Sequence, residues 1–275
     1  MAQAYCAPSL ALLGLEPVRA VLEYIGAWTM DRRALPAGDG HPVVLFPGLA
    51  SDQTCLAPLR EFCQELGYEA SDWGRGFNTG PPGDVEAWVG ELAREVADAA
   101  ERRGRRISLV GWSLGGLYAR EIARLVPHSV RQVITLGSPF AADGDATNVG
   151  WLCRMLGGLP ARIAPELAQR LPRTPPVPTT SVYSRSDGVV AWQACVEPCD
   201  HRQAQNIEVE ASHVGLVWSS RVWSVVADRL AQPEGRWRLF GEPAKPMRSA
   251  SRASAAGVAA LATAQLSAKA GRLAA

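Results

Sequence analysis

A serine flanked by glycines, at a point where a strand turns into a helix, is the feature that most constrains this chain. Residues 107–110 form a short apolar run that predicts a strand, and residues 117–122 have the character of a helix. Between them lies Gly-Trp-Ser-Leu-Gly, with Ser113 at its centre. The two backbones pass close together there, so only small residues fit two positions before and after the serine, and Gly111 and Gly115 occupy them. The strained backbone of such a turn presents the serine hydroxyl at the carboxyl edge of a sheet.

Predicted strands and helices alternate along most of the chain. Apolar or β-branched runs predict strands at residues 42–46, 68–71, 107–110, 130–136, 179–183 and 206–209. Apolar residues at helical spacing predict helices at residues 53–66, 85–99, 117–122 and 215–230, and Asp84 is placed to cap the second of them. This alternation favours an α/β fold with a doubly wound, mostly parallel sheet.

The composition excludes several classes of protein. With 275 residues, of which 47% are hydrophobic and 20% charged, the chain is typical of a globular protein with one large domain. A formal net charge of +1 offers no basic face for a nucleic-acid partner. The six cysteines include no C-x-x-C pair, so we expect reduced thiols. Cys195, Cys199 and His201 lie close in the sequence but lack a second ligand cluster, so we expect no metal site and no cofactor.

The segment 1–40 predicts a helix ahead of the main domain. No positive charge precedes its first apolar run, so neither a signal peptide nor a membrane span fits, and we expect a cytoplasmic protein. Pro17 suits the first turn of a helix, and apolar residues follow at helical spacing between Val18 and Ile25. This pattern favours a helix packed on the domain; peripheral contact with a membrane monolayer or with a partner is the alternative.

The rest of the chain divides into a domain at residues 41–240 and a tail at 241–275. The tail is rich in Ala and Ser with scattered Lys and Arg, which indicates a flexible or marginally helical segment. Within the domain, prolines and glycines interrupt the apolar pattern of residues 141–176. We interpret this insert as a small helical cap on the sheet.

Topology selects the base that could activate Ser113. A serine hydroxyl becomes a nucleophile when a base accepts its proton and a carboxylate orients that base. The active sites of open α/β sheets lie at the carboxyl ends of the strands. Of the 4 histidines, His213 follows a predicted strand, whereas His41, His128 and His201 precede strands. The order of the elements therefore favours His213.

The acid that would orient this base also has to follow a strand. Asp187 comes directly after the strand at 179–183, and Asp143 and Asp145 come after the strand at 130–136. We expect Asp187 to be the acid and keep Asp143 and Asp145 as the alternatives.

These motifs together resemble the serine hydrolases of the α/β-hydrolase superfamily, on the lipase and esterase side. The resemblance runs from residue 41 to residue 240 and is strongest to small bacterial members with a Gly-Trp-Ser-Leu-Gly-Gly turn. In this family the acid usually follows the penultimate strand in a setting like S-x-x-D-G-V-V, which residues 184–190 match. The chain order Ser113, Asp187, His213 is also the order of the family.

The resemblance also implies an oxyanion hole made of two backbone amides. One is the amide of Leu114, the residue after the nucleophile, and the other is that of Leu49 in the loop after the first strand. Many lipases have a histidine before the glycine of this loop, and here Pro47 occupies that position. This departure leaves open which loop amide completes the hole.

The activity implied is cleavage of a carboxylic ester through an acyl-enzyme, without a cofactor. Apolar residues of the cap favour an acyl or lipid-like substrate. The residues expected to line the acyl pocket are Trp151, Leu152, Met155, Leu156 and Leu159. Packing of these residues in the core is the alternative. A thioesterase or acyltransferase could use the same triad, a lyase or a cofactor-free oxygenase could share the fold, and a non-catalytic binding protein is the rival from another class.

Overall fold

A computed structural model describes residues 8–141, 165–198 and 201–242 of the chain. The chain divides into two compact units, residues 1–240 and 241–275, and the described helices and strands lie in the first unit. The subdivision of the chain at residue 40 and the character of the tail stay predictions. No helix within the described ranges combines the length and the apolar character that a membrane crossing requires.

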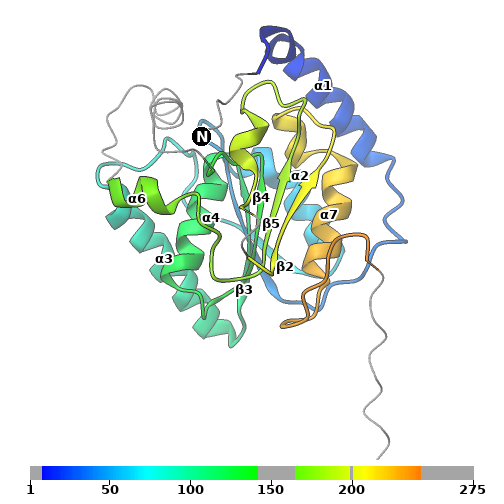
Figure 1. The fold of residues 1–275 in the computed structure, drawn as a ribbon. Coiled ribbons are helices and arrows are strands. Elements are labelled where there is room, and N and C mark those ends of the chain that lie inside the picture. Colours follow the sequence, from blue (N-terminus) through cyan, green and yellow to red (C-terminus); the bar gives the residue numbers. More distant parts are fainter. Residues whose placement is uncertain (1–7, 142–164, 199–200, 243–275) are drawn as a thin grey trace, which may run out of the picture. The chain divides into compact units, whose positions relative to one another are not determined.

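A six-stranded sheet, parallel in all its pairs, forms the centre of the first unit (Figure 1). The strands are β1 (Pro42–Phe46), β2 (Glu69–Asp72), β3 (Ile107–Trp112), β4 (Val130–Leu136), β5 (Thr179–Tyr183) and β6 (Ala204–Glu208). Their spatial order is β2-β1-β3-β4-β5-β6, so the direction of winding reverses between β1 and β3. Ligands of open α/β sheets bind at the carboxyl ends of the strands beside such a reversal. The topology thus points to the loops after β1 and β3.

Helices cover both faces of this sheet, which confirms the doubly wound arrangement. Within the described ranges the α-helices are α1 (Leu10–Trp28), α2 (Gln53–Glu65), α3 (Val85–Arg103), α4 (Leu114–Leu125), α6 (Pro165–Arg170) and α7 (Ser220–Leu230). In Figure 1, α3, α4 and α6 lie on one side of the strands, and α1, α2 and α7 lie on the other. Asp84 caps α3 as predicted, since its side chain accepts a hydrogen bond of 2.7 Å from the amide of Ala87.

Alternation along the strands divides the core into two clusters. In β3, the side chain of Leu109 packs in the cluster with α3 and α4, and that of Val110 packs in the cluster with α2 and α7. Successive side chains of a strand point to opposite faces, so a strand with helices on both sides is buried along its whole length and is mostly apolar. All residues of β3 and β4 are buried for this reason.

Two predicted elements differ from the structure near the last strand. The strand predicted at 206–209 begins earlier and ends at Glu208. The single helix predicted at 215–230 is instead a short 3₁₀ turn, η2 (Val214–Val217), followed by α7. Ser219 separates them because its backbone is extended, with φ −72° and ψ 131°, at the position that precedes the first helical residue.

The N-terminal helix α1 packs on the rest of the first unit, but not through the apolar stripe identified in the sequence. Val18 is 60% exposed and Ile25 is 56% exposed, whereas the buried residues of the helix are Glu16, Ala20 and Ala27. The orientation has a physical cause. The helix lies against two polar loops of the sheet edge, and its charged side chains contact those loops. Charged side chains are buried at low cost only where polar groups bind them, and the two loops supply those polar groups. The charged face of the helix therefore faces the loops.

Candidate active site

Ser113 lies on the sharp turn between β3 and α4, as the sequence predicts. Its backbone has φ 51° and ψ −121°, a left-handed conformation that a residue with a side chain rarely adopts. The flanking glycines are required by contact: a Cβ atom on Gly111 would overlap Gly116, and one on Gly115 would overlap the carbonyl of Phe46. The turn therefore holds the serine in a fixed position at the carboxyl end of β3.

The hydroxyl of Ser113 is buried and has no hydrogen-bond partner among the described residues. Its backbone amide donates to the carbonyl of Leu136 at 2.8 Å, which fixes the serine against the neighbouring strand β4. A buried hydroxyl without a partner costs about 1–3 kcal/mol, so each such group needs an explanation, and a catalytic role is one explanation. The hydroxyl and the imidazole of His213 do not form a hydrogen bond in this structure; in unliganded active sites such bonds are often long.

The loop after β1 passes directly beside the serine. A Cβ atom on Gly48 would lie 3.2 Å from the Cβ atom of Ser113, which places the neighbouring Leu49 close to the turn. Leu49 is partly buried. Leu114 is the first residue of α4, and an amide in the first turn of a helix has no acceptor within the helix. The two amides implied by the resemblance thus lie on the two segments that meet at Ser113.

Asn78 holds this loop in place, and the sequence analysis did not identify it. Its side-chain amide donates to the carbonyl of Pro47 at 2.8 Å, and its backbone carbonyl accepts from Ala50 at 2.8 Å. Its side-chain oxygen accepts from the hydroxyl of Tyr118 at 3.2 Å. Asn78 is fully buried. The sequence shows only an asparagine within a glycine-rich loop, and asparagine is also common in ordinary turns.

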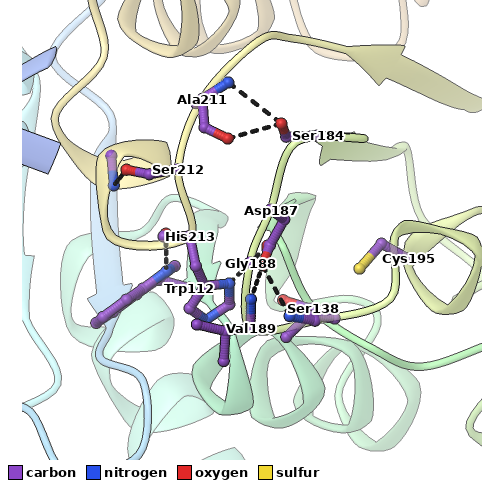
Figure 2. A network of polar contacts seen from close by, with 12 residues as sticks. Trp112, Ser138, Ser184, Asp187, Gly188, Val189, Cys195, Ala211, Ser212 and His213 are labelled. Atoms are coloured by element: carbon purple, nitrogen blue, oxygen red, sulfur yellow. Dashed lines mark hydrogen bonds and ion pairs between the residues drawn. The ribbon is translucent and has the colours of Figure 1, made fainter. Parts of the chain in front are cut away.

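Asp187 and His213 contact each other, as Figure 2 shows. An oxygen of the Asp187 carboxylate lies 2.7 Å from Nδ1 of His213, and the other oxygen accepts from the amides of Val189 and Val190 at 2.8 and 2.7 Å. The indole of Trp112, the residue before Ser113, donates to the backbone carbonyl of His213 at 3.0 Å. Both loops are thereby held at the edge of the sheet where Ser113 lies.

The surroundings of His213 shift its protonation. Burial lowers the pKa of the imidazole, but the Asp187 carboxylate raises it through charge and a hydrogen bond, and the Glu16 carboxylate adds to this effect. The net shift of the pKa is upward from 6.5. With Nδ1 directed at a carboxylate, the neutral ring has its proton on Nδ1, and Nε2 remains as the proton acceptor.

Gly137, at the carboxyl end of β4, makes room for this pair. Its φ is 57°, and a Cβ atom there would lie 3.3 Å from Nδ1 of His213 and 3.4 Å from the Asp187 carboxylate. The same atom would lie 2.5 Å from the side chain of Leu216. A larger residue would therefore displace the pair. The sequence offered a glycine after a strand, which by itself indicates only a turn.

A second serine–histidine–aspartate set lies at the opposite edge of the sheet. Nδ1 of His41 lies 2.5 Å from an oxygen of Asp39, and Nε2 lies 2.8 Å from the hydroxyl of Ser108. His41 and Ser108 are fully buried. Burial lowers the pKa of His41, although Asp39 partly offsets this effect, so the ring is neutral at pH 7. His41 and Ser108 fill core positions and are hydrogen-bonded to each other, whereas the Asp39 side chain is exposed at the surface.

Several sequence predictions lie outside the described residues. They include the alternative acids Asp143 and Asp145, and the expected acyl-pocket residues Trp151, Leu152, Met155, Leu156 and Leu159. The cap at 141–176 lies mostly in the same range, and its described part contains α6. Where side chains are described, no cluster of three histidine, cysteine, aspartate or glutamate residues could hold a metal ion.

Curated relatives match part of the chain. No protein-family model matches it. A pimeloyl-(acyl-carrier protein) methyl ester esterase from Sodalis glossinidius is 46% identical over 57 residues, or 20% of this chain and 21% of the relative. An enzyme of the same name from Legionella pneumophila is 30% identical over 110 residues, or 39% of this chain and 43% of the relative. The alignments thus span less than half the length of these relatives.

Solved structures match a larger share of the chain. Aspergillus fumigatus lipase B superimposes with a TM-score of 0.57 at 16% identity, covering 74% of this chain and 56% of that one. An alpha/beta superfamily hydrolase from Oenococcus oeni superimposes with a TM-score of 0.54 at 14% identity, covering 70% and 92%. Together with the parallel six-stranded sheet and the serine on the turn after β3, these likenesses show that the chain has the α/β-hydrolase fold.

Proposed function

We propose that this protein is a serine hydrolase that cleaves a carboxylic ester through an acyl-enzyme. The observation that carries the proposal is the hydrogen-bonded pair of Asp187 and His213 at the sheet edge that also carries the strained turn of Ser113. The three residues come from separate loops, after β5, β6 and β3, and share the edge where ligands of such sheets bind. The names of the curated relatives, which are esterases, support the same class of reaction.

The first half of the reaction forms the acyl-enzyme. The oxygen of Ser113 attacks the ester carbonyl, while its proton passes to Nε2 of His213 and the carbonyl electron pair moves to the oxygen. The tetrahedral intermediate then expels the alkoxide, which takes the proton from Nε2 and leaves as the alcohol. Asp187 keeps the ring in the required tautomer and stabilises the imidazolium.

The second half of the reaction releases the acid. Water gives a proton to Nε2 of His213 and attacks the acyl carbonyl. Collapse of the second tetrahedral intermediate breaks the bond to Ser113 and returns the proton to its oxygen. The amides of Leu49 and Leu114 are the proposed donors to both oxyanions, and each is worth about 3 kcal/mol in the transition state.

The proposed substrate is an ester with an apolar acyl chain. The names of the curated relatives specify a methyl ester of a carrier-bound acyl group, which is an ester with a small alcohol. The cap residues between 151 and 159 are the proposed lining of the acyl pocket. Thioester cleavage and transfer of the acyl group to an alcohol would pass through the same kind of acyl-enzyme, and product analysis separates them from ester hydrolysis.

Labelling with a fluorophosphonate tests this proposal. The probe should modify the wild-type protein at Ser113 and leave Ser113→Ala unmodified, while Ser113→Ala folds normally and loses almost all hydrolysis of p-nitrophenyl esters. Ser108→Ala is the matched control, because the Ser108 hydroxyl is equally buried but lies near the other end of β3, where it contacts His41. It should keep both labelling and hydrolysis. Near-wild-type hydrolysis by Ser113→Ala would refute the proposed nucleophile.

We further propose that α1 contacts a membrane surface from the cytoplasmic side. The charged residues of α1 are Glu16, Arg19 and Glu23, and all of them contact loops of the sheet edge. The outer face of the helix is apolar and exposed by between 47% and 84%; it consists of Leu10, Leu13, Leu15, Val18, Val21, Leu22, Ile25 and Trp28. An exposed apolar helix face that ends in a tryptophan is typical of helices that lie in a lipid interface.

A further inference from the structure

A buried carboxylate from the N-terminal helix lies between the two loops that carry the acid and the base. Glu16 is 6% exposed. One of its carboxylate oxygens accepts from the amide of Gly188 at 2.7 Å and from the amide of His213 at 3.0 Å. The other oxygen accepts from the same amide of His213 at 2.8 Å. A single side chain thus bridges the residue that follows Asp187 and the base itself.

The neighbouring charged residues of α1 support this bridge. Arg19 donates to the carbonyl and the hydroxyl of Ser186, at 2.5 and 2.8 Å, in the loop that carries the acid. Glu23 accepts from the amide of Ser212 at 2.8 Å, directly before the base. Arg19 and Glu23 contact neighbours of the pair, whereas Glu16 contacts the base directly.

The loops that carry Asp187 and His213 are packed closely against α1, so they cannot move further toward the helix. A Cβ atom on Gly188 would lie 2.6 Å from a backbone carbon of Leu12, and one on Gly215 would overlap the side chain of Glu23. The loops therefore approach the helix as closely as glycine allows. On the far side, the hydroxyl of Ser184 donates to the carbonyl of Ala211 at 2.7 Å and accepts from its amide at 3.2 Å, which ties the same two loops together (Figure 2).

We propose that Glu16 is a positioning residue for the triad, because its carboxylate fixes the acid-bearing loop relative to the base. This inference rests on the proposed function of Ser113, Asp187 and His213. Without the carboxylate, two buried amides lose their acceptor, and the two loops lose the bridge nearest to the reacting groups. A shift of about 1 Å between base and acid is enough to lower a rate about 100-fold.

The charge of Glu16 acts in the same direction. The ionisable groups that act on His213 are Asp187, from the loop after β5, and Glu16, from α1, and both raise its pKa against the effect of burial. During the reaction the ring becomes an imidazolium, so a second carboxylate nearby stabilises the charged intermediate. This contribution is separate from packing and can be measured separately.

The test compares Glu16→Ala and Glu16→Gln with two controls. Glu61→Gln makes the same change at an exposed position of α2, and Val96→Ala removes buried volume from α3, on the opposite side of the sheet. We expect Glu16→Ala to lower kcat tenfold or more with KM changed less than about threefold. Glu16→Gln keeps one acceptor oxygen for the two amides, so we expect a kcat between those of the wild type and the alanine variant. For the same reason we expect Glu16→Gln to fold even if Glu16→Ala does not.

A signal that does not depend on turnover separates this inference from the proposed function. In the proton NMR spectrum, the Nδ1 proton of His213 should give a downfield resonance that is lost in Asp187→Asn. We expect Glu16→Gln to shift or broaden this resonance and the two controls to leave it unchanged. If Ser113 is not labelled by a fluorophosphonate, the proposed function fails, and this resonance still decides the role of Glu16.

Two results would overturn the positioning role. One is a folded Glu16→Gln protein with an unchanged Nδ1 resonance and wild-type kcat. The other is a loss of kcat in Glu16→Ala that matches the loss in Val96→Ala at an equal fall in melting temperature, because that loss would reflect general stability alone.

Discussion

Two serines of β3 and its following turn, Ser108 and Ser113, have the same hydroxyl group but different surroundings. Ser108 is the second residue of β3, and its hydroxyl contacts both the imidazole of His41 and the side-chain amide of Gln132. The hydroxyl of Ser113 has no partner among the described residues and lies on a strained turn. A complete hydrogen-bond network stabilises a core, whereas the hydroxyl of Ser113 keeps an unused capacity for a hydrogen bond.

The role of the acid can be tested at this scale by Asp187→Asn. We expect kcat to fall by about 10⁴-fold with little change in KM, because the amide cannot hold the ring in the required tautomer or stabilise its positive charge. Asp39→Asn is the matched control, since Asp39 contacts His41 in the same manner. It should lower stability and leave kcat unchanged. A comparable loss of kcat in Asp143→Asn or Asp145→Asn, with Asp187→Asn active, would assign the acid to the earlier strand.

The raised pKa of His213 predicts the pH dependence of the reaction. The base must be neutral to accept the proton of Ser113, and a raised pKa keeps the ring protonated to a higher pH. The acidic limb of the profile of kcat/KM should therefore have its midpoint above 6.5, the ordinary value for histidine. The stabilisation that accompanies protonation has the matching sign: it is present below pH 6.5 and is lost as the pH rises through the pKa of the folded protein. A midpoint at or below 6.5 would contradict the assignment.

At the scale of elements, the N-terminal helix has a charged face that contacts two loops and an apolar face that is exposed, and the proposed membrane contact of the apolar face can be measured. Vesicles of phosphatidylcholine should bind the wild-type protein, and Leu22→Asp and Ile25→Asp should each weaken this binding, because they place a charge in the apolar face. Leu125→Asp is the control, as Leu125 is 50% exposed on α4. The proposal would be overturned if the wild-type protein did not bind vesicles and sedimented as a dimer that the same two changes dissociate. The partner of the apolar face would then be a second copy of the chain.

The cap is the second element whose role can be measured. If Trp151 and Leu156 line the acyl pocket, Trp151→Ala and Leu156→Ala should shift the preference for chain length tenfold or more, since one methylene group is worth about 1–3 kcal/mol. The measurement is kcat/KM for acetyl through decanoyl esters, together with the melting temperature of each variant. An unchanged preference with a lower melting temperature would place both residues in the core and leave the triad unaffected.

For the whole molecule, the sequence predicts the parallel sheet correctly, and it predicts which edge of the sheet the candidate residues occupy, because both follow from the order of elements along the chain; the roles of these residues stay predictions. Ser113, Asp187 and His213 each follow a strand, and parallel strands bring their carboxyl ends to one edge. The orientation of α1 could not be predicted in this way. Its apolar spacing indicated a buried stripe, but the polar loops that it covers lie about 170 to 200 residues further along the chain, as the contacts of Glu16 with Gly188 and His213 show.

The central claim is that Ser113 carries the acyl group during turnover, and trapping that intermediate tests it most directly. When the protein is mixed rapidly with a p-nitrophenyl acyl ester, the absorbance should show a burst of p-nitrophenol of about one equivalent per active site. The mixture is then quenched with acid, and peptide mass analysis locates the acyl group. The added acyl mass should lie on the peptide that contains Ser113, and Ser108→Ala should give the same adduct. Continued ester hydrolysis by Ser113→Ala, or an acyl adduct on another residue in the wild-type protein, would contradict the account.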